Sequence, residues 1–387
     1  MHPVTISAAA GGLVFRVLKR VGGASDDTVR PLRAVPLLLV LTWLPLAVLT
    51  LLDGTFMGGA VEVPFLRDPA VQARLLIALP LLLIGEAKMS RLAQMTLELI
   101  RERRLVPEAE MPALDSRVVQ LVRERDSWPV DLVIIVGTVA AMWFAKGTIV
   151  AERMGAHTSW LGSGEVLSWA GWWYFMVSGV VVNVIGVRWL WWLLIWTRFL
   201  VGFLRPRLVV SPGHPDLHGG LAFLTMVQSG LAPVLTSLAA TVSGRLGFEL
   251  LYDGATLDVV KLPAAVVMLL AVLVMFLPLL LFSGRILGLK RRALLQYDAL
   301  GQQLVAGFEQ KWLGAARTDE PLLSSSDPST YTDYIAVYAS LRQMQPSPLD
   351  VRRALPALIM VAVPFLPLLL TELSMKEIVL RMLKLVM

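Results

Sequence analysis

Two histidines and an aspartate alternate in one short polar segment, as His214, Asp216 and His218. Two imidazoles and a carboxylate form a ligand set that zinc and other transition metals accept. The alternative is structural, because Pro215 keeps His214 out of a helix and an aspartate is a good helix cap. We favour the structural interpretation and expect neither a metal nor another cofactor here.

The same segment has two features of an anion site. Arg205 and Arg207 precede it, and a helix is expected to start soon after it, where free backbone N–H groups attract a phosphate. If the cluster were catalytic, its substrate would be a lipid headgroup. The sequence contains no cysteine, no Gly-rich phosphate loop and no G-x-S-x-G or H-E-x-x-H motif. We therefore expect a non-enzyme.

The elements that position these residues are long apolar segments. The chain has 387 residues, of which 56% are hydrophobic and 17% charged, whereas soluble domains have about 45–50% and about 25%. Residues 168–203 contain seven of the twelve tryptophans. Trp172 and Trp192 would lie about 30 Å apart along a helix, which is the thickness of the hydrocarbon layer. Because tryptophan collects at membrane interfaces, we predict a membrane-spanning helix with both ends marked.

The sequence predicts an all-α polytopic membrane protein of about seven spans with a small cytoplasmic helical layer. The expected spans are 35–52, a segment from residue 75, 129–145, 168–203, 221–242, 262–282 and 355–371. Six spans result if the last segment is re-entrant. Small and hydroxyl side chains place the fifth span in the centre of the bundle. Pro364 and Pro367 should kink or break the last one.

The expected organisation has four parts. Residues 1–34 form a basic amphipathic arm, and 35–284 hold spans one to six with cytoplasmic helices at 88–126. Residues 285–353 form a cytoplasmic helical segment in which extensions of the second and sixth spans meet. Residues 354–387 hold the last span and a tail.

Four polar side chains fall in or near the predicted spans: Glu86, Lys88, Asn183 and Arg188. Ionisable groups inside a membrane are costly and mark pathways by default. Glu86 and Lys88 lie near a span end, where they can reach the interface. Asn183 is expected to bond a neighbouring helix. Arg188 is either a deep arginine facing a cavity or the inner boundary of its span, and we favour the boundary.

Aromatic residues line the predicted cytoplasmic helices, among them Tyr331, Tyr334 and Tyr338. These tyrosines are candidates for a partner surface. The simpler interpretation, which we favour, is that the two helices pack on each other and on the extension of the second span.

The distribution of positive charge gives the orientation. With the N-terminus inside and seven spans, 26 of the 35 Lys and Arg residues fall on the inner side. Cytoplasmic segments carry this excess, so we predict a cytoplasmic N-terminus. The net charge of +6 then needs no nucleic-acid partner.

The pattern HPD-x-x-GGL-x-F at residues 214–223 resembles one found in bacterial multi-pass inner-membrane proteins. The segment 341–348, LRQMQPSP, is similar to another in that group. The resemblance implies a multi-pass fold in a bacterial inner membrane and assigns no catalytic residue. The predicted topology is also similar to that of insect-chemoreceptor-type cation channels, although no motif is shared.

The functional expectation is a channel-like or passive transport protein in contact with the lipid bilayer, with a homo-oligomer as the assembly. It depends on the small-residue fifth span, the broken last span and the lack of an energising domain. The alternatives are a scaffold or sensor that binds a cytoplasmic protein through its helices, and a lipid-modifying enzyme.

Overall fold

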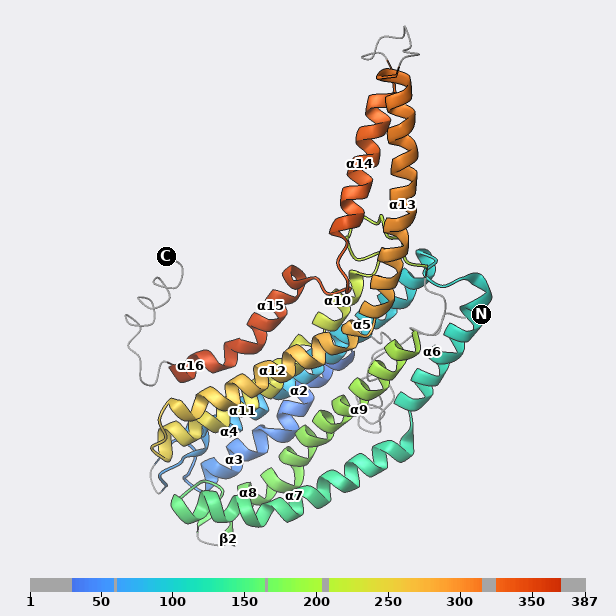
Figure 1. Ribbon diagram of the computed structural model, residues 1–387. Coiled ribbons are helices and arrows are strands. Elements are labelled where there is room, and N and C mark those ends of the chain that lie inside the picture. Colours follow the sequence, from blue (N-terminus) through green and yellow to red (C-terminus); the bar gives the residue numbers. More distant parts are fainter. Residues whose placement is uncertain (1–29, 59–60, 164–165, 204–208, 315–324, 370–387) are drawn as a thin grey trace.

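The computed structural model describes residues 30–58, 61–163, 166–203, 209–314 and 325–369, and it is almost entirely helical in these ranges (Figure 1). Seven of its helical segments are long and apolar enough to cross a membrane: Ala34–Leu52, Pro69–Glu102, Glu108–Thr148, Trp169–Phe203, Phe223–Tyr252, Asp258–Leu280 and Val351–Leu369. The prediction of an all-α polytopic membrane protein with seven spans is confirmed. The expected N-terminal arm, apart from its last residues, and the tail lie outside the described residues.

The first four spans contain several interruptions. Their elements are α2 (Arg30–Thr42), α3 (Leu44–Leu52), η1 (Phe65–Arg67), α4 (Pro69–Gln72), the π-helical η2 (Ala73–Ala78), α5 (Leu79–Glu102), η3 (Glu108–Glu110), α6 (Met111–Arg125), α7 (Trp128–Ala156), α8 (Trp169–Trp173), the π-helical η4 (Tyr174–Ser178) and α9 (Gly179–Phe203). Strands β1 (Gly162–Ser163) and β2 (Val166–Leu167) pair antiparallel between the third and fourth spans.

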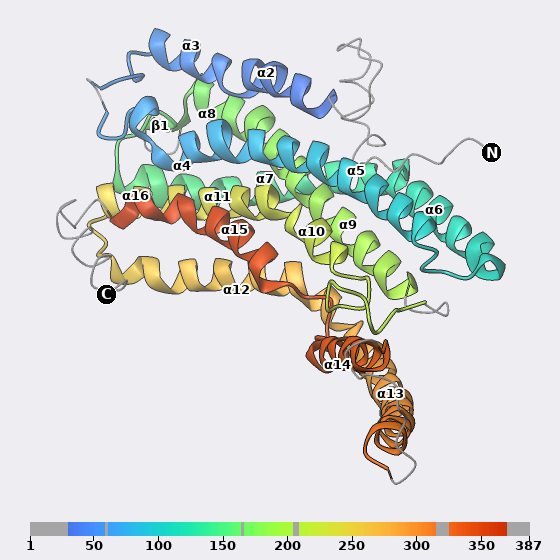
Figure 2. The same ribbon diagram turned by 90° about the horizontal axis from the view of Figure 1, so that it is seen from above.

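The second half holds α10 (Phe223–Ser229), α11 (Ala232–Tyr252), α12 (Asp258–Leu280), α13 (Ser283–Trp312), α14 (Asp327–Gln343), α15 (Val351–Ala362), η6 (Val363–Phe365) and α16 (Leu366–Leu369). Helices α13 and α14 lie side by side and project beyond the bundle in both views (Figures 1 and 2). We call this end of the bundle the hairpin end, and the opposite one the strand end.

Helix α11 is the centre of the bundle, as predicted. In its most apolar stretch 83% of the residues are buried, against 22–50% in the other six spans. The fifth span, predicted to end at residue 242, is longer than expected, because α11 continues to Tyr252. A Cβ at Gly244 would lie 2.7 Å from the carbonyl oxygen of Pro69 and 2.6 Å from Cβ of Ala73. This close packing on the second span keeps the additional turns helical.

Prolines interrupt two spans, and neighbouring helices satisfy the carbonyl groups there. Pro45 has no N–H for the carbonyl of Leu41, and the indole of Trp173 donates to that oxygen at 3.2 Å. In the last span the α-helix gives way to the 3-10 turn η6 around Pro364. The hydroxyl of Ser243 on α11 donates to the carbonyl of Pro364 at 2.5 Å. The expected break in the last span is confirmed.

The tryptophans mark only one end of the fourth span. Its 35 residues extend about 52 Å, well beyond the hydrocarbon thickness. Trp169 and Trp172 are exposed at the strand end, as interfacial residues should be. Trp192 and Trp196, in contrast, are buried and stacked with 5.3 Å between ring centroids, and Nε1 of Trp196 donates to Gln228. These inner tryptophans pack inside the protein and do not mark headgroup depth.

The helices of the hairpin pack on each other. Tyr334 donates its hydroxyl to the carbonyl of Tyr297 at 2.6 Å, and its ring lies against Gly301. Helix α14 begins at Asp327 with Ser326 as its cap residue, and the Asp327 carboxylate accepts from Nζ of Lys311 at 2.6 Å. The expected meeting with the extension of the second span is not seen in the two views, where α6 and the end of α5 lie apart from the hairpin.

Candidate functional site

The Asp216 carboxylate organises the loop before α10. One of its oxygens accepts the backbone N–H groups of His218 and Gly220 at 2.8 and 3.0 Å, and the other accepts that of Ala222 at 3.2 Å. The Nδ1 atom of His214 lies 2.9 Å from Asp216. Burial alone would raise the pKa of Asp216, but these N–H groups and the His214 charge outweigh it and lower that pKa.

The two short stretches that carry the resemblance meet in space. His218 Nδ1 lies 2.7 Å from the carbonyl oxygen of Ser347, the Gln345 N–H donates to the Leu217 carbonyl at 2.7 Å, and Thr225 donates to the Pro348 carbonyl at 2.5 Å. We call residues 211–222 and 344–350 together the loop joint. Within the described chain, its His and Asp side chains do not form a group that could hold a metal ion. Arg205 and Arg207 lie outside the described residues.

A second set of charged side chains lies where α6 meets α7. Arg188 on α9 pairs with Asp131 in the first turn of α7, and its Nη2 donates to the Arg125 carbonyl at 3.2 Å. Asp131 and Arg125 are both buried. Arg188 thus lies beside the point where the charged α6 gives way to the apolar α7. Asp131 and Arg125 were not predicted from the sequence, because charged residues are common near helix ends and carry no specific signal there.

Glu86 completes this set, which we call the charged cluster: Glu86, Arg125, Asp131 and Arg188. Glu86 is 2% exposed, and its Oε1 has no hydrogen-bond partner among the described residues. The charges that act on its carboxyl group are those of Arg188 and Arg125. Lys88, two residues further along, is exposed on the outside of the bundle and does not join the cluster. Glu86 is therefore a buried carboxyl group rather than one that reaches the interface.

A third polar group lies nearer the strand end, between the two π-helical segments. Arg74 in η2 donates to Asn183 on α9 at 2.6 Å and to the Tyr174 hydroxyl in η4 at 3.3 Å. The amide of Asn183 also contacts the Met142 sulfur at 3.0 Å, so its expected bonds to neighbouring helices are confirmed. Arg74, Tyr174 and Met142 line a pocket of about 360 Å³.

Arg74 was missed because the second span was expected to start one residue after it. The signal was present in Asp68-Pro69, an acidic residue followed by a proline at a helix start. The Asp68 carboxylate accepts the N–H groups of Ala70 and Val71 at 3.0 and 3.2 Å, and the helix begins there. The span therefore includes Arg74.

The three candidate tyrosines of α14 serve the hairpin. Tyr331 stacks on Phe308 of α13 with 5.6 Å between centroids, and Tyr338 stacks on Tyr334 at 6.0 Å. All three are only partly exposed. Among the exposed side chains of the hairpin are several aliphatic ones, for example Leu295, Leu313 and Ile335.

Fold and polar groups together define an all-α, multi-pass integral membrane protein with ionisable side chains buried between its spans. No family model, no curated protein and no solved structure matches the chain. The function must therefore be argued from the geometry alone.

Proposed function

We propose that the protein is a passive transport protein that conducts a small ion or polar solute along the α5–α9 interface. The observation that carries the proposal is the presence of ionisable groups at two depths of this interface. Arg74 bonds Asn183 near the strand end, and Glu86 lies near Arg188 towards the hairpin end. Twelve residues separate Arg74 from Glu86 on one helix, which is about 18 Å of membrane depth.

Buried charges of this kind cost folding free energy, so their presence between the spans indicates a function. An apolar layer solvates charge poorly, so ionisable residues within spans are rare and mark ion pathways. The pocket beside Arg74 supports an entrance from the strand end. The two π-helical segments that present Arg74 and Tyr174 add support, because such segments occur often at functional sites.

The test is ion flux into liposomes that contain the purified full-length chain and dyes sensitive to H⁺, K⁺ or Cl⁻. We expect flux above that of protein-free liposomes, and a large reduction in Glu86→Gln and Arg74→Gln. Lys88→Gln is the matched control, because it removes a charge from the same helix on the outside of the bundle. Wild-type liposomes that remain tight under every gradient would refute the proposal.

We further propose that the hairpin end faces the cytoplasm of a bacterial cell. The excess of Lys and Arg in the segments assigned to that side supports this orientation. We treat the chain as a non-enzyme, because the polar groups of the loop joint are engaged in hydrogen bonds to backbone atoms. Labelling of single cysteines introduced at Ser325 and Ser163 from either side of the membrane checks the orientation.

A second candidate function is a scaffold that binds a protein through the α13–α14 hairpin. The hairpin projects from the bundle and exposes Leu295, Leu313 and Ile335, which are 73%, 76% and 50% exposed. Exposed apolar side chains on a soluble projection are typical of protein-binding surfaces. A stoichiometric partner that is lost with Leu295→Asp plus Ile335→Asp, but kept with Gln302→Asp, would favour this function. Removing Tyr334 is a poorer test, because it holds the hairpin together.

A further inference from the structure

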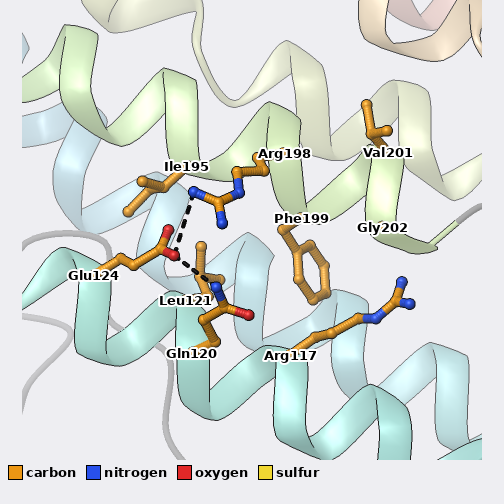
Figure 3. A pocket seen from close by; sticks show the side chains of 9 residues that line it. All are labelled: Arg117, Gln120, Leu121, Glu124, Ile195, Arg198, Phe199, Val201 and Gly202. Atoms are coloured by element: carbon orange, nitrogen blue, oxygen red, sulfur yellow. Dashed lines mark hydrogen bonds and ion pairs between the residues drawn. The ribbon is translucent and has the colours of Figure 1, made fainter.

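A pocket of about 220 Å³ lies between α6 and the last turns of α9, at the hairpin end (Figure 3). Its apolar walls come from Leu121, Ile195 and Phe199. Its polar groups come from both helices: Arg117, Gln120 and Glu124 on α6, and Arg198 on α9. The pocket is separate from the α5–α9 pathway, so a ligand bound here does not depend on the proposed transport function.

Three of the polar side chains, Gln120, Glu124 and Arg198, interact with one another, whereas Arg117 does not join them. Glu124 lies 3.4 Å from Nη1 of Arg198 and accepts from Gln120 at 2.8 Å. Figure 3 shows these three together on one side of the Phe199 ring, with Arg117 extending along the other side towards Gly202. The Arg117 Nη1 is buried and has no hydrogen-bond acceptor among the described residues. Two positive charges thus meet a single negative one, and a buried donor lacks a partner.

Gly202 lies against the Arg117 guanidinium, which would have to shift by a few tenths of an ångström to make room for a side chain at this position. A Cβ there would lie 3.0 Å from Nη1 and 3.7 Å from Cζ of Arg117. A buried donor without an acceptor is costly, and guanidinium groups suit phosphate oxygens because they offer a fork of parallel N–H donors. An anion with several acceptor oxygens would satisfy Arg117 and balance the charge.

The depth of the pocket indicates where the anion comes from. Helix α6 carries charged residues and leads into the apolar α7 at Trp128, so α6 lies at the level of the lipid headgroups. We propose that this pocket binds a phosphate group, with Arg117 as its main ligand and Arg198 as the second. Two sources carry this group at that depth: the headgroup of an anionic phospholipid, and free phosphate from solution.

The test uses the full-length chain in detergent and two probes. Native mass spectrometry measures retention of added phosphatidylglycerol against phosphatidylcholine, and calorimetry measures binding of inorganic phosphate. We expect Arg117→Gln to weaken binding about tenfold, which is the loss of roughly one charge-assisted hydrogen bond. Arg123→Gln is the matched control, since Arg123 is exposed on the same helix and does not line the pocket.

A steric variant separates this site from a general effect of charge. Gly202→Ala keeps every charge and pushes against the Arg117 guanidinium, so it should also weaken binding. Retention of phosphatidylglycerol alone assigns the site to a lipid headgroup, and binding of phosphate alone assigns it to a soluble anion. The proposal is overturned if the wild-type chain binds neither probe, or if Arg117→Gln and Arg123→Gln weaken binding equally. If Arg117→Gln does not fold, binding by Gly202→Ala is the test: unchanged binding of both probes by this variant overturns the proposal.

Discussion

His218 donates its Nδ1 proton to the backbone carbonyl of Ser347, 129 residues further along the chain, at 2.7 Å. A carbonyl only accepts, so the proton must be on Nδ1. The contact ties the segment before α10 to the segment between α14 and α15. Lys290 adds bonds to the carbonyls of Arg342 and Met344, at 2.8 and 2.6 Å. The hairpin is thus fixed to the bundle at its base while its body projects freely.

The first prediction concerns Asp216, whose carboxylate orders the loop joint. Asp216→Asn should lower the free energy of unfolding by about 1–3 kcal/mol, because an amide oxygen replaces a charged acceptor of three N–H groups. Thermal unfolding in detergent measures the change. Asp115→Asn is the control, since Asp115 forms only an exposed pair with Arg101 and should have little effect.

The same residue gives a pH dependence. The folded protein holds the pKa of Asp216 below its unfolded value near 3.8. Its contribution to stability is therefore fully present above that value and is lost as the pH falls through the folded pKa. Wild-type protein should lose more stability than Asp216→Asn as the pH falls below about 4. Identical pH profiles for the two proteins would contradict the prediction.

The second prediction concerns His157 at the strand end, where its ring links the loop that contains Glu62 to the loop that contains Asp253. Its Nε2 lies 2.9 Å from Asp253 and its Nδ1 lies 3.2 Å from Glu62. Only the protonated ring donates to both. The hydrogen bond to Asp253 is the largest cause that raises the pKa of His157, and the bond to Glu62 adds to it.

The sign is opposite to that of Asp216. Because the folded pKa is above the unfolded value near 6.5, the stabilisation is complete below that value and is lost as the pH rises through the folded pKa. The thermal midpoint of the wild-type protein should fall over this interval, and His157→Gln should remove that fall. Glu62→Gln plus Asp253→Asn should also remove it, because the ring then lacks both carboxylates. A fall that persists in both variants would show that another group is responsible.

The sequence was sufficient to predict the membrane spans but not which faces of the spans pack against one another. Apolar runs of about 20 residues report the lipid environment directly, which is why seven spans were predictable. Hydrophobicity does not show which side of a spanning helix faces protein, because lipid and the protein interior are equally apolar. Trp192 and Trp196 were for this reason assigned to an interface although they are buried against protein.

The candidate site was only partly predictable for a related reason. Asn183 and Arg188 are visible in the sequence because they interrupt an apolar run. Their partners Arg74 and Asp131 lie near the helix starts, where charge is expected and carries no information. Pairing across 57 or 109 positions depends on how the spans pack. Only the fold brings these residues together.

The third prediction is a double-mutant cycle on Arg188 and Asp131. Their side chains are 11% and 5% exposed, so each neutralises a charge that lipid and protein solvate poorly. Arg188→Met should cost about 3–5 kcal/mol by removing the opposite charge beside the buried Asp131. The double variant with Asp131→Leu should cost less than the sum of the two single variants. Lys261→Met, which breaks an exposed pair, is the control and should change little. Strict additivity would mean that the two residues do not stabilise each other.

The fourth prediction compares two glycines on α13. A Cβ at Gly301 would lie 2.3 Å from the Tyr334 hydroxyl oxygen, whereas one at Gly307 meets no atom within 4 Å. Gly301→Ala must move the Tyr334 ring and break its bond to the Tyr297 carbonyl, a loss of about 1–3 kcal/mol. Gly307→Ala should stabilise the helix by about 0.5–1 kcal/mol, because alanine restricts the unfolded chain.

Hydrogen exchange of the α13–α14 amides measures both effects. Exchange should become faster in Gly301→Ala and slower in Gly307→Ala, with the spans unchanged in each case, because the hairpin body projects beyond the bundle. If Gly301→Ala also loosened the spans, the hairpin would be coupled to the bundle well beyond its base. Equal exchange in the two variants would mean that Tyr334 does not hold α13 and α14 together. The Tyr334–Tyr297 bond would then be incidental to the hairpin.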